Sequence, residues 1–159
     1  MAIIGAPLSG LFADFWQKRN NRGRLYFAAL TAAVTTVLLI VMVLLKFNTV
    51  GIAIGILYGI FSIMSQPVLM SVSQDVVPAA HKGFSMGIGL FCTYVFGGAW
   101  GPLAIGGISD AFGGGAGGLG TALTISGGAG ILSAIMFLFA ARHYAPDMAR
   151  VEHETLLAQ

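Results

Sequence analysis

Four long runs without a charged residue constrain the fold of this 159-residue chain more than any other feature. They cover residues 25–45, 50–73, 84–108 and 119–141. A helix needs about 20 apolar residues to cross a bilayer, and each run is at least that long. Only 9% of all residues are charged, against about 25% in a typical soluble domain. The sequence therefore predicts an all-α, polytopic membrane protein with four full transmembrane helices.

A shorter apolar run occupies residues 1–13. As a helix it would reach about 20 Å, less than the bilayer's hydrocarbon core of about 30 Å. We expect a truncated leading helix, the second half of a membrane helix whose first half is missing, in a piece of a longer protein. Breaks are expected near residues 15–24, 46–49, 74–82 and 109–119. Residues 1–141 would form a partial transmembrane half-domain, and residues 142–159 a polar tail.

The cations predict how the helices are oriented. Cytoplasmic loops of membrane proteins carry an excess of Lys and Arg. With four crossings, seven cations fall on one side of the membrane and only Lys46 on the other. The seven are Lys18, Arg19, Arg22, Arg24, Lys82, Arg142 and Arg150. This distribution predicts a multi-pass protein of the cell or inner membrane with a cytoplasmic C-terminal tail.

Two polar loops carry a family resemblance. In the first, Gly10 is followed after three residues by Asp14 and then by the cations Lys18 and Arg19. This pattern resembles the signature loop of the major facilitator superfamily, although Phe15 and Gln17 stand where that family usually has a cation and a glycine. The second loop is similar to a later facilitator loop at four positions, namely Asp75, Pro78, Lys82 and Gly83.

A third stretch, residues 97–107, resembles the glycine-proline motif of facilitator antiporters. One extra residue separates Pro102 from the double glycine at 106–107, so antiport is not inferred. The sequences of residues 74–78 and 101–110 are similar to those of the spinster-like branch, which includes lipid and organic-solute transporters. The resemblance implies a half-domain of a secondary transporter that moves a small organic solute or lipid-like molecule by alternating access.

Facilitators repeat one six-helix plan twice, so the resemblance leaves two alignments. The chain corresponds either to the eighth to twelfth helices or to the second to sixth. Four spans after the signature loop, followed by a polar tail, favour the eighth to twelfth. Its partners would then be the lipid bilayer, a small-molecule substrate and the missing N-terminal half of the same transporter.

The signature loop has two interpretations. Its charges could serve only to orient the chain, or they could form a conformational latch. The resemblance implies a latch in which Gly10, Asp14, Lys18 and Arg19 bridge to neighbouring helix ends. An acid can pair with a cation or a helix N-terminus and lose that partner when two halves rock apart.

Within the second run, a polar stripe and a glycine face lie at helical spacing. Tyr58, Ser62 and Gln66 would face a cavity or make hydrogen bonds between helices, with Tyr94 and Trp100 as further cavity candidates. Glycines four residues apart allow close helix packing. They are Gly51, Gly55 and Gly59, then Gly97 and Gly101, which precedes Pro102; Ser126, Gly130 and Ala134 share a face of the last span.

The sequence gives no sign of catalysis. No predicted span contains an acid, a cation or a histidine, and all three histidines lie in polar segments. We therefore expect no enzyme activity, cofactor, metal site or nucleic-acid partner. The alternative to a transporter fragment is a stand-alone structural or assembly membrane protein that packs through its glycine faces.

Overall fold

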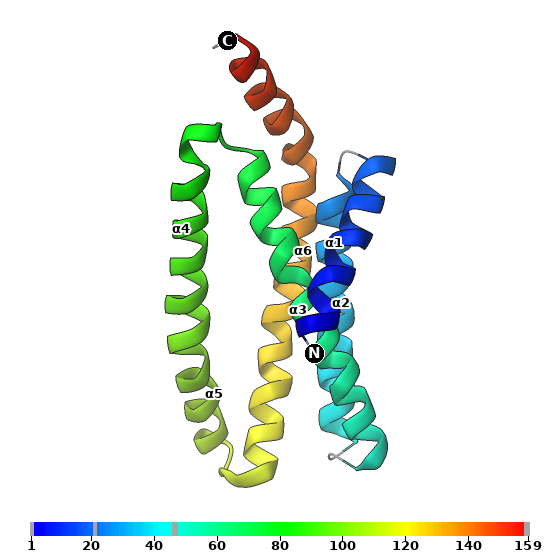
Figure 1. Ribbon diagram of the computed structural model, residues 1–159. Coiled ribbons are helices and arrows are strands. Elements are labelled where there is room, and N and C mark those ends of the chain that lie inside the picture. Colours follow the sequence, from blue (N-terminus) through cyan, green and yellow to red (C-terminus); the bar gives the residue numbers. More distant parts are fainter. Residues whose placement is uncertain (1, 21, 46–47, 158–159) are drawn as a thin grey trace.

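The computed structural model describes residues 2–20, 22–45 and 48–157, with side chains described from Ser9 to Val151 outside those gaps and for His153. The described residues form helices and no strand, which confirms the all-α prediction. In chain order, they are α1 (Ala2–Arg19), α2 (Gly23–Leu44), α3 (Thr49–Asp75), the 3-10 turn η1 (Ala79–His81), α4 (Lys82–Cys92), the π-helical η2 (Thr93–Ala99), α5 (Trp100–Ala111) and α6 (Gly115–Leu157) (Figure 1).

Four segments are long and apolar enough to cross a membrane, and they confirm the four predicted spans. They are Gly23–Leu44, Thr49–Asp75, Ala79–Ala111 and Gly115–Val151. The third span combines η1, α4, η2 and α5. Its middle is π-helical, a wider winding that usually appears only as a single turn inside an α-helix. The expected short leading helix is α1, which has 18 residues.

The helices run alternately between two ends of the bundle (Figure 1). At one end α1 finishes, α2 starts, α3 finishes and α4 starts, and the second half of α6 passes the same level. We call this the cation-rich end, because the seven cations predicted to share one side lie in these segments. The turns between α2 and α3 and between α5 and α6 lie at the other end. Lys46, the predicted exception, lies outside the described residues.

Local chemistry explains where the helices at that other end begin. The Asn48 side chain caps α3, because its oxygen accepts hydrogen bonds from the backbone N–H groups of Val50 and Gly51, both at 3.1 Å. Between α5 and α6 the chain takes positive φ angles of 90°, 66° and 61° at Gly113, Gly114 and Gly115. Residues with a Cβ rarely adopt such angles, so the chain turns at these three glycines, within the break predicted at 109–119, and α6 begins at Gly115.

The packed part of the molecule consists of α1, α2, α3 and α6. One buried cluster joins α1, α2 and α3, and consists of Ala13, Phe27, Ala28, Met64 and Val68. A second joins α2 to α6 through Leu25, Ala141 and Tyr144. Further along the α2–α6 contact, Thr36 lies so close to α6 that a Cβ on Gly130 would overlap its hydroxyl oxygen. Small residues therefore bring these two helices together, as is common between membrane helices.

Helix α6 continues without a break through the predicted start of the tail at residue 142. Its 43 residues correspond to about 65 Å, roughly twice the thickness of the hydrocarbon core. In Figure 1 its C-terminal part extends past the other helices at the cation-rich end. Tyr144, only 3% exposed, still packs in the bundle although it lies beyond the last apolar run. The first turns of the polar segment thus belong structurally to the bundle.

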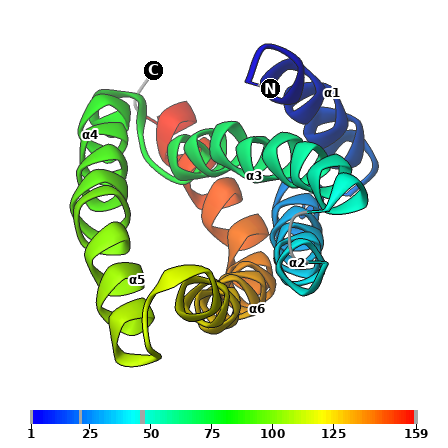
Figure 2. The same ribbon diagram turned by 90° about the horizontal axis from the view of Figure 1, so that it is seen from below.

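The arm formed by α4, η2 and α5 is much less enclosed. It lies on the side of α3 opposite α1, and its second half, α5, packs against α6 (Figures 1 and 2). None of the residues of α4 or η2 is buried, and Ser109 is the buried residue of α5. Large apolar side chains such as Phe84, Phe91 and Leu103 are exposed along the arm. Such exposure suits a helix surrounded by lipid or by further protein.

Candidate functional site at the cation-rich end

The site is built around Arg24, which lies in the first turn of α2. Its Nη2 atom donates to Asp14 Oδ1 of α1 at 2.8 Å, and its Nη1 atom donates to Asp75 Oδ2 of α3 at 2.5 Å. The Tyr144 hydroxyl of α6 donates to the same Asp75 oxygen at 2.6 Å. We call Asp14, Arg24, Asp75 and Tyr144 the Arg24 cluster. It joins the last turns of α1, the first turn of α2, the end of α3 and an interior turn of α6 through three polar contacts.

The two acids have different environments. The side chains of Arg24 and Asp75 are only 22% and 26% exposed, whereas that of Asp14 is 60% exposed. Charged hydrogen bonds are stronger where water is excluded, and a partly buried charge is costly to leave without its partner. The Arg24–Asp75 pair is therefore the more permanent contact. The Arg24–Asp14 pair is screened by solvent and easier to open.

Apolar packing holds the four helices in place around the cluster. Ala13 lies next to Asp14 in α1 and belongs to the buried cluster with Phe27 and Met64. Leu25 lies next to Arg24 and packs against Tyr144. A buried hydrogen bond from Ser9 Oγ to the Met64 carbonyl oxygen, 2.5 Å long, also ties α1 to α3. The charged groups therefore meet on a frame that is already fixed by buried side chains.

One donor of Arg24 remains unused. Its Nε atom is buried and has no hydrogen-bond partner among the described residues. A cavity of about 300 Å³ opens beside the cluster, lined by Asp14, Gln17, Lys18 and Arg24. The arrangement holds an Arg, two acids and a Tyr, which two ion pairs and one further hydrogen bond join between helices.

The structure separates the predicted signature-loop residues. Asp14 belongs to the cluster. It pairs with Arg24, and not with Lys18 or Arg19, the predicted latch cations. Lys18 and Arg19 lie exposed in the last turn of α1, and neither forms an ion pair with a described residue. Gly10 lies one turn before Asp14, and a Cβ there would meet no atom within 4 Å. Close packing within the described chain therefore does not require glycine at that position.

Of the second-loop residues, Asp75 enters the cluster as the last residue of α3. Pro78 precedes η1, and its carbonyl oxygen accepts the His81 N–H at 2.9 Å. Lys82 and Gly83 begin α4 and are exposed. The loop thus supplies one acid to the cluster, while its other predicted residues shape the turn into α4.

The cavity candidates do not come together. Tyr58 lines a crevice of about 250 Å³ between α2, α3, α5 and α6, which it shares with Thr36 and Ser126. The Ser62 hydroxyl donates to the Gly59 carbonyl of its own helix at 3.1 Å, and Gln66 is exposed. On the arm, Tyr94 and Trp100 are 70% and 63% exposed. Their role as a cavity wall stays a prediction.

The predicted packing glycines fall into two groups. A Cβ on Gly51 would lie 3.7 Å from the Met42 carbonyl oxygen, and a Cβ on Gly55 would lie 3.1 Å from the Met42 Sδ atom. This face therefore packs against α2. A Cβ on Gly97 or Gly101 would meet no described atom within 4 Å, and Pro102 beside them is exposed. Glycines with the same spacing therefore make a close contact in α3 but have no described neighbour in the arm.

Comparison with known families decides the identity. The family described as Major Facilitator Superfamily matches residues 1–102, which run from α1 into α5 and include both polar loops. The chain belongs to the major facilitator superfamily. A comparison with curated proteins gives no match.

Membership of the major facilitator superfamily confirms the resemblance seen in the two loops. Together with the four spans, it makes the chain an integral, multi-pass membrane protein of a transporter family. Members of this superfamily are generally not enzymes, in keeping with the expectation from the sequence.

Sequence reasoning missed two members of the cluster. Arg24 was one of four cations in the first loop, and spacing alone does not tell which of them turns toward Asp14. Tyr144 lies beyond the last apolar run, where a polar tail is expected. A Tyr three residues into a polar segment is a weak signal, because its partner Asp75 is 69 residues away in the chain.

Proposed function

We propose that this chain forms the eighth to twelfth helices of a facilitator-type secondary transporter, which moves a small organic solute or lipid-like molecule by alternating access. The family match supports transport in general. The four spans and polar segment that follow the signature loop support the C-terminal half, and the similarity of residues 74–78 and 101–110 to the spinster-like branch supports this substrate class. An upstream coding sequence that continues in frame and encodes seven more helices is the expected finding. An upstream sequence encoding only one helix would favour the second to sixth instead.

The observation that carries the mechanism is the bridge from Arg24 to acids on two other helices. In alternating access, bundles of helices rock against each other as nearly rigid bodies. The Arg24 cluster would make the cation-rich ends of α1, α2, α3 and α6 move together. The exposed Asp14 contact would be the one that opens and closes, whereas the Asp75 contact would persist.

Transport by the proposed full-length protein tests this mechanism. Asp14→Asn should lower solute uptake into proteoliposomes up to about fivefold, because an exposed, solvent-screened ion pair is worth at most about 1 kcal/mol. Membrane insertion should be unchanged. Asp110→Asn is the matched control, since Asp110 is also exposed but lies near the other end, in α5, without an ion pair among the described residues. Normal uptake by Asp14→Asn would reduce the loop to a signal for orientation.

We further propose that the cation-rich end faces the cytoplasm, on the basis of its excess of Lys and Arg. An impermeant thiol reagent applied outside cells should then label a cysteine placed at Asn48. It should miss a cysteine placed at Thr155 until the membrane is permeabilised. Labelling in the reverse pattern would invert the orientation.

The alternative, an assembly protein that packs through glycine faces, has one observation in its favour. The arm carries Gly97 and Gly101 on a face that nothing in the described chain covers. Reconstitution of residues 1–159 distinguishes the two functions. We expect no saturable uptake of organic solutes above empty vesicles, because the wall opposite α3 would be supplied by the other half. Saturable uptake that Gln66→Leu abolishes would mean that the chain is a complete small transporter.

A further inference from the structure

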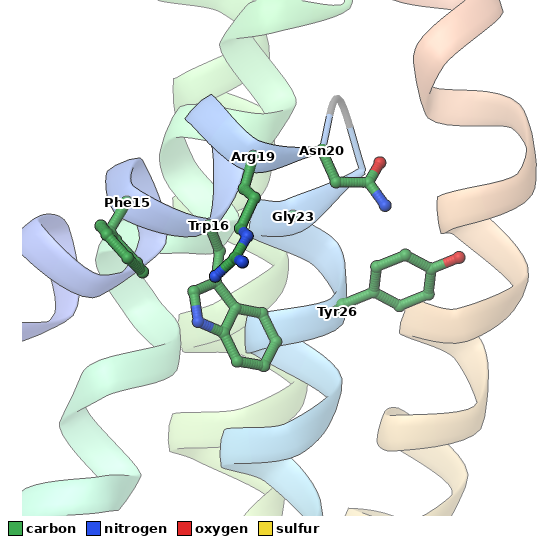
Figure 3. Close-up of a pocket in the computed structure, with 6 residues that line it drawn as sticks. All are labelled: Phe15, Trp16, Arg19, Asn20, Gly23 and Tyr26. Atoms are coloured by element: carbon green, nitrogen blue, oxygen red, sulfur yellow. The ribbon is translucent and has the colours of Figure 1, made fainter.

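A pocket of about 460 Å³ opens between the last turns of α1 and the first turns of α2 (Figure 3). It is lined by Phe15, Trp16, Arg19, Asn20, Gly23 and Tyr26. The Arg24 cluster and its cavity use other positions of α1, namely Asp14, Gln17 and Lys18. Helix α1 therefore presents one face to the cluster and another to this pocket, and the proposed transport mechanism does not use the second face.

Helix packing and backbone hydrogen bonds fix the shape of the pocket. Gly23 is buried at its floor, and a Cβ there would overlap the backbone carbonyl of Trp16, so the two helices touch at this point. The Trp16 ring packs edge-on against Phe27 of α2, with ring centroids 6.0 Å apart and an interplanar angle of 73°. The turn above is closed by hydrogen bonds from Asn20 N to Trp16 O at 3.0 Å and from Gly23 N to Asn20 O at 2.7 Å. Its shape is thus set by packing and backbone geometry.

The polar groups that face the pocket are hydrogen-bond donors. Arg19 offers a guanidinium and Trp16 an indole N–H, and in Figure 3 both point to the same side of α1. The Asn20 side-chain oxygen accepts the Arg22 N–H at 3.0 Å, which leaves its NH₂ group as a further donor. No acid lines the pocket, and Arg19 has no ion pair with a described residue. Asp14, the nearest acid along the chain, is held by Arg24. This set of donors is complementary to an anion.

The remaining lining is aromatic and exposed. Phe15 is 59% exposed, and Trp16 and Tyr26 are each 36% exposed. Aromatic rings collect where a membrane helix meets the headgroups, and basic pockets between helices bind the phosphates of anionic lipids. A soluble anion would use the donors but would leave the rings in water. A phospholipid would use both, with its phosphate at the donors and the start of its acyl chains on the rings.

We propose that this pocket binds the headgroup of an anionic phospholipid, with the phosphate held by Arg19 and the neighbouring Trp16 indole N–H and the upper acyl chain against the exposed aromatic rings of the lining. The site lies at the cation-rich end, where α1 ends and α2 begins. A lipid bound there contacts both helices at the point where Gly23 brings them together.

Fluorescence quenching tests the proposal on the complete 159-residue chain. The sequence has two tryptophans, so Trp100→Phe leaves Trp16 as the reporter. The protein is reconstituted into phosphatidylcholine vesicles that contain a minority of phosphatidylglycerol, with bromine near the acyl carbonyl on one lipid or the other at equal mole fraction. Brominated phosphatidylglycerol should quench Trp16 about fivefold more effectively, the preference expected for one cation at an anionic surface.

Neutralising single cations separates the pocket from the general surface charge. Arg19→Gln should remove the preference, and Arg19→Glu should reverse it. Lys18→Gln is the matched control, because it removes the neighbouring cation, which does not line the pocket, and should keep the preference. Circular dichroism of each variant checks that the helices are intact.

Three results would overturn the proposal. Equal quenching by the two brominated lipids would mean that no anionic lipid is selected. Equal loss in the Lys18 and Arg19 variants would mean diffuse attraction to the surface. Abolition of the preference by soluble glycerol phosphate would make the pocket a site for a free phosphate compound.

Discussion

The spans of the bundle (α2, α3 and α6) and the arm of α4 and α5 are all apolar enough to cross a membrane, with mean hydropathies of 1.8–2.6 and 1.5, yet among the described residues the buried core clusters lie in the bundle, where α1 joins them. Both contain glycines at spacing four. In the bundle Gly51 and Gly55 meet Met42, whereas in the arm Gly97 and Gly101 meet no described atom within 4 Å. Hydropathy thus reports the preference of a helix for lipid over water. Which helices pack together depends on complementary surfaces and on polar contacts such as the Arg24 cluster.

Filling the α2–α6 contact should have the largest effect on stability. Gly130→Leu should lower the free energy of unfolding by about 3 kcal/mol, because the side chain must displace Thr36 from a tight contact. Gly101→Leu in the arm should change it by less than about 0.5 kcal/mol. An SDS titration followed by circular dichroism measures both. Equal losses would mean that the arm is packed as closely as the bundle.

Breaking the more buried ion pair should come next. Asp75→Asn removes the charge that pairs with Arg24 and weakens the bond from Tyr144, at a cost of about 2 kcal/mol. The same titration should show less than about 0.5 kcal/mol for Asp110→Asn, an exposed acid of the arm. If the two variants unfold alike, the Arg24 cluster does not stabilise the bundle.

The smallest expected effect comes from one hydroxyl group. Tyr144→Phe keeps the ring in the core but removes the hydrogen bond to Asp75, and should cost about 1 kcal/mol. Tyr94→Phe in the arm, where the ring is exposed, should cost nothing measurable. A loss with Tyr94→Phe as large as that with Tyr144→Phe would show that the arm's hydroxyl also has a structural partner.

Much of the fold could be predicted, because helix number and length follow from the apolar runs. The predicted breaks enclose the helix ends at Arg19, Asp75 and Ala111, whereas α2 ends at Leu44, two residues before the break predicted at 46–49. The π-helical winding of η2 was not foreseen, since a span of given hydropathy can take either winding. The continuation of α6 past residue 142 was not foreseen either, because a fall in hydropathy marks the expected edge of the bilayer and not the end of a helix.

The candidate site could be predicted only in part. Asp14 and Asp75 were selected from two separate loops, and the structure brings both to one cation. That the cation is Arg24, rather than Lys18 or Arg19, depends on the turn at 20–23 and on Gly23, which set the direction in which α2 leaves α1. The composition of the loops shows which charged residues are available, but it does not predict the direction in which α2 leaves α1.

The sequence by itself determined that the chain is helical, spans a membrane four times and gathers its cations at one end. Each of these depends on residue type and order along a single helix, since every backbone group in lipid must be satisfied within its own segment. Only the tertiary structure decided that Tyr144 reaches Asp75, that Thr36 meets Gly130 and that α1 offers two different faces at the cation-rich end. Those contacts join residues far apart in the chain, and the relative rotation and approach of whole helices set them. Lipid solvates all apolar faces alike, so hydropathy carries no information about that choice.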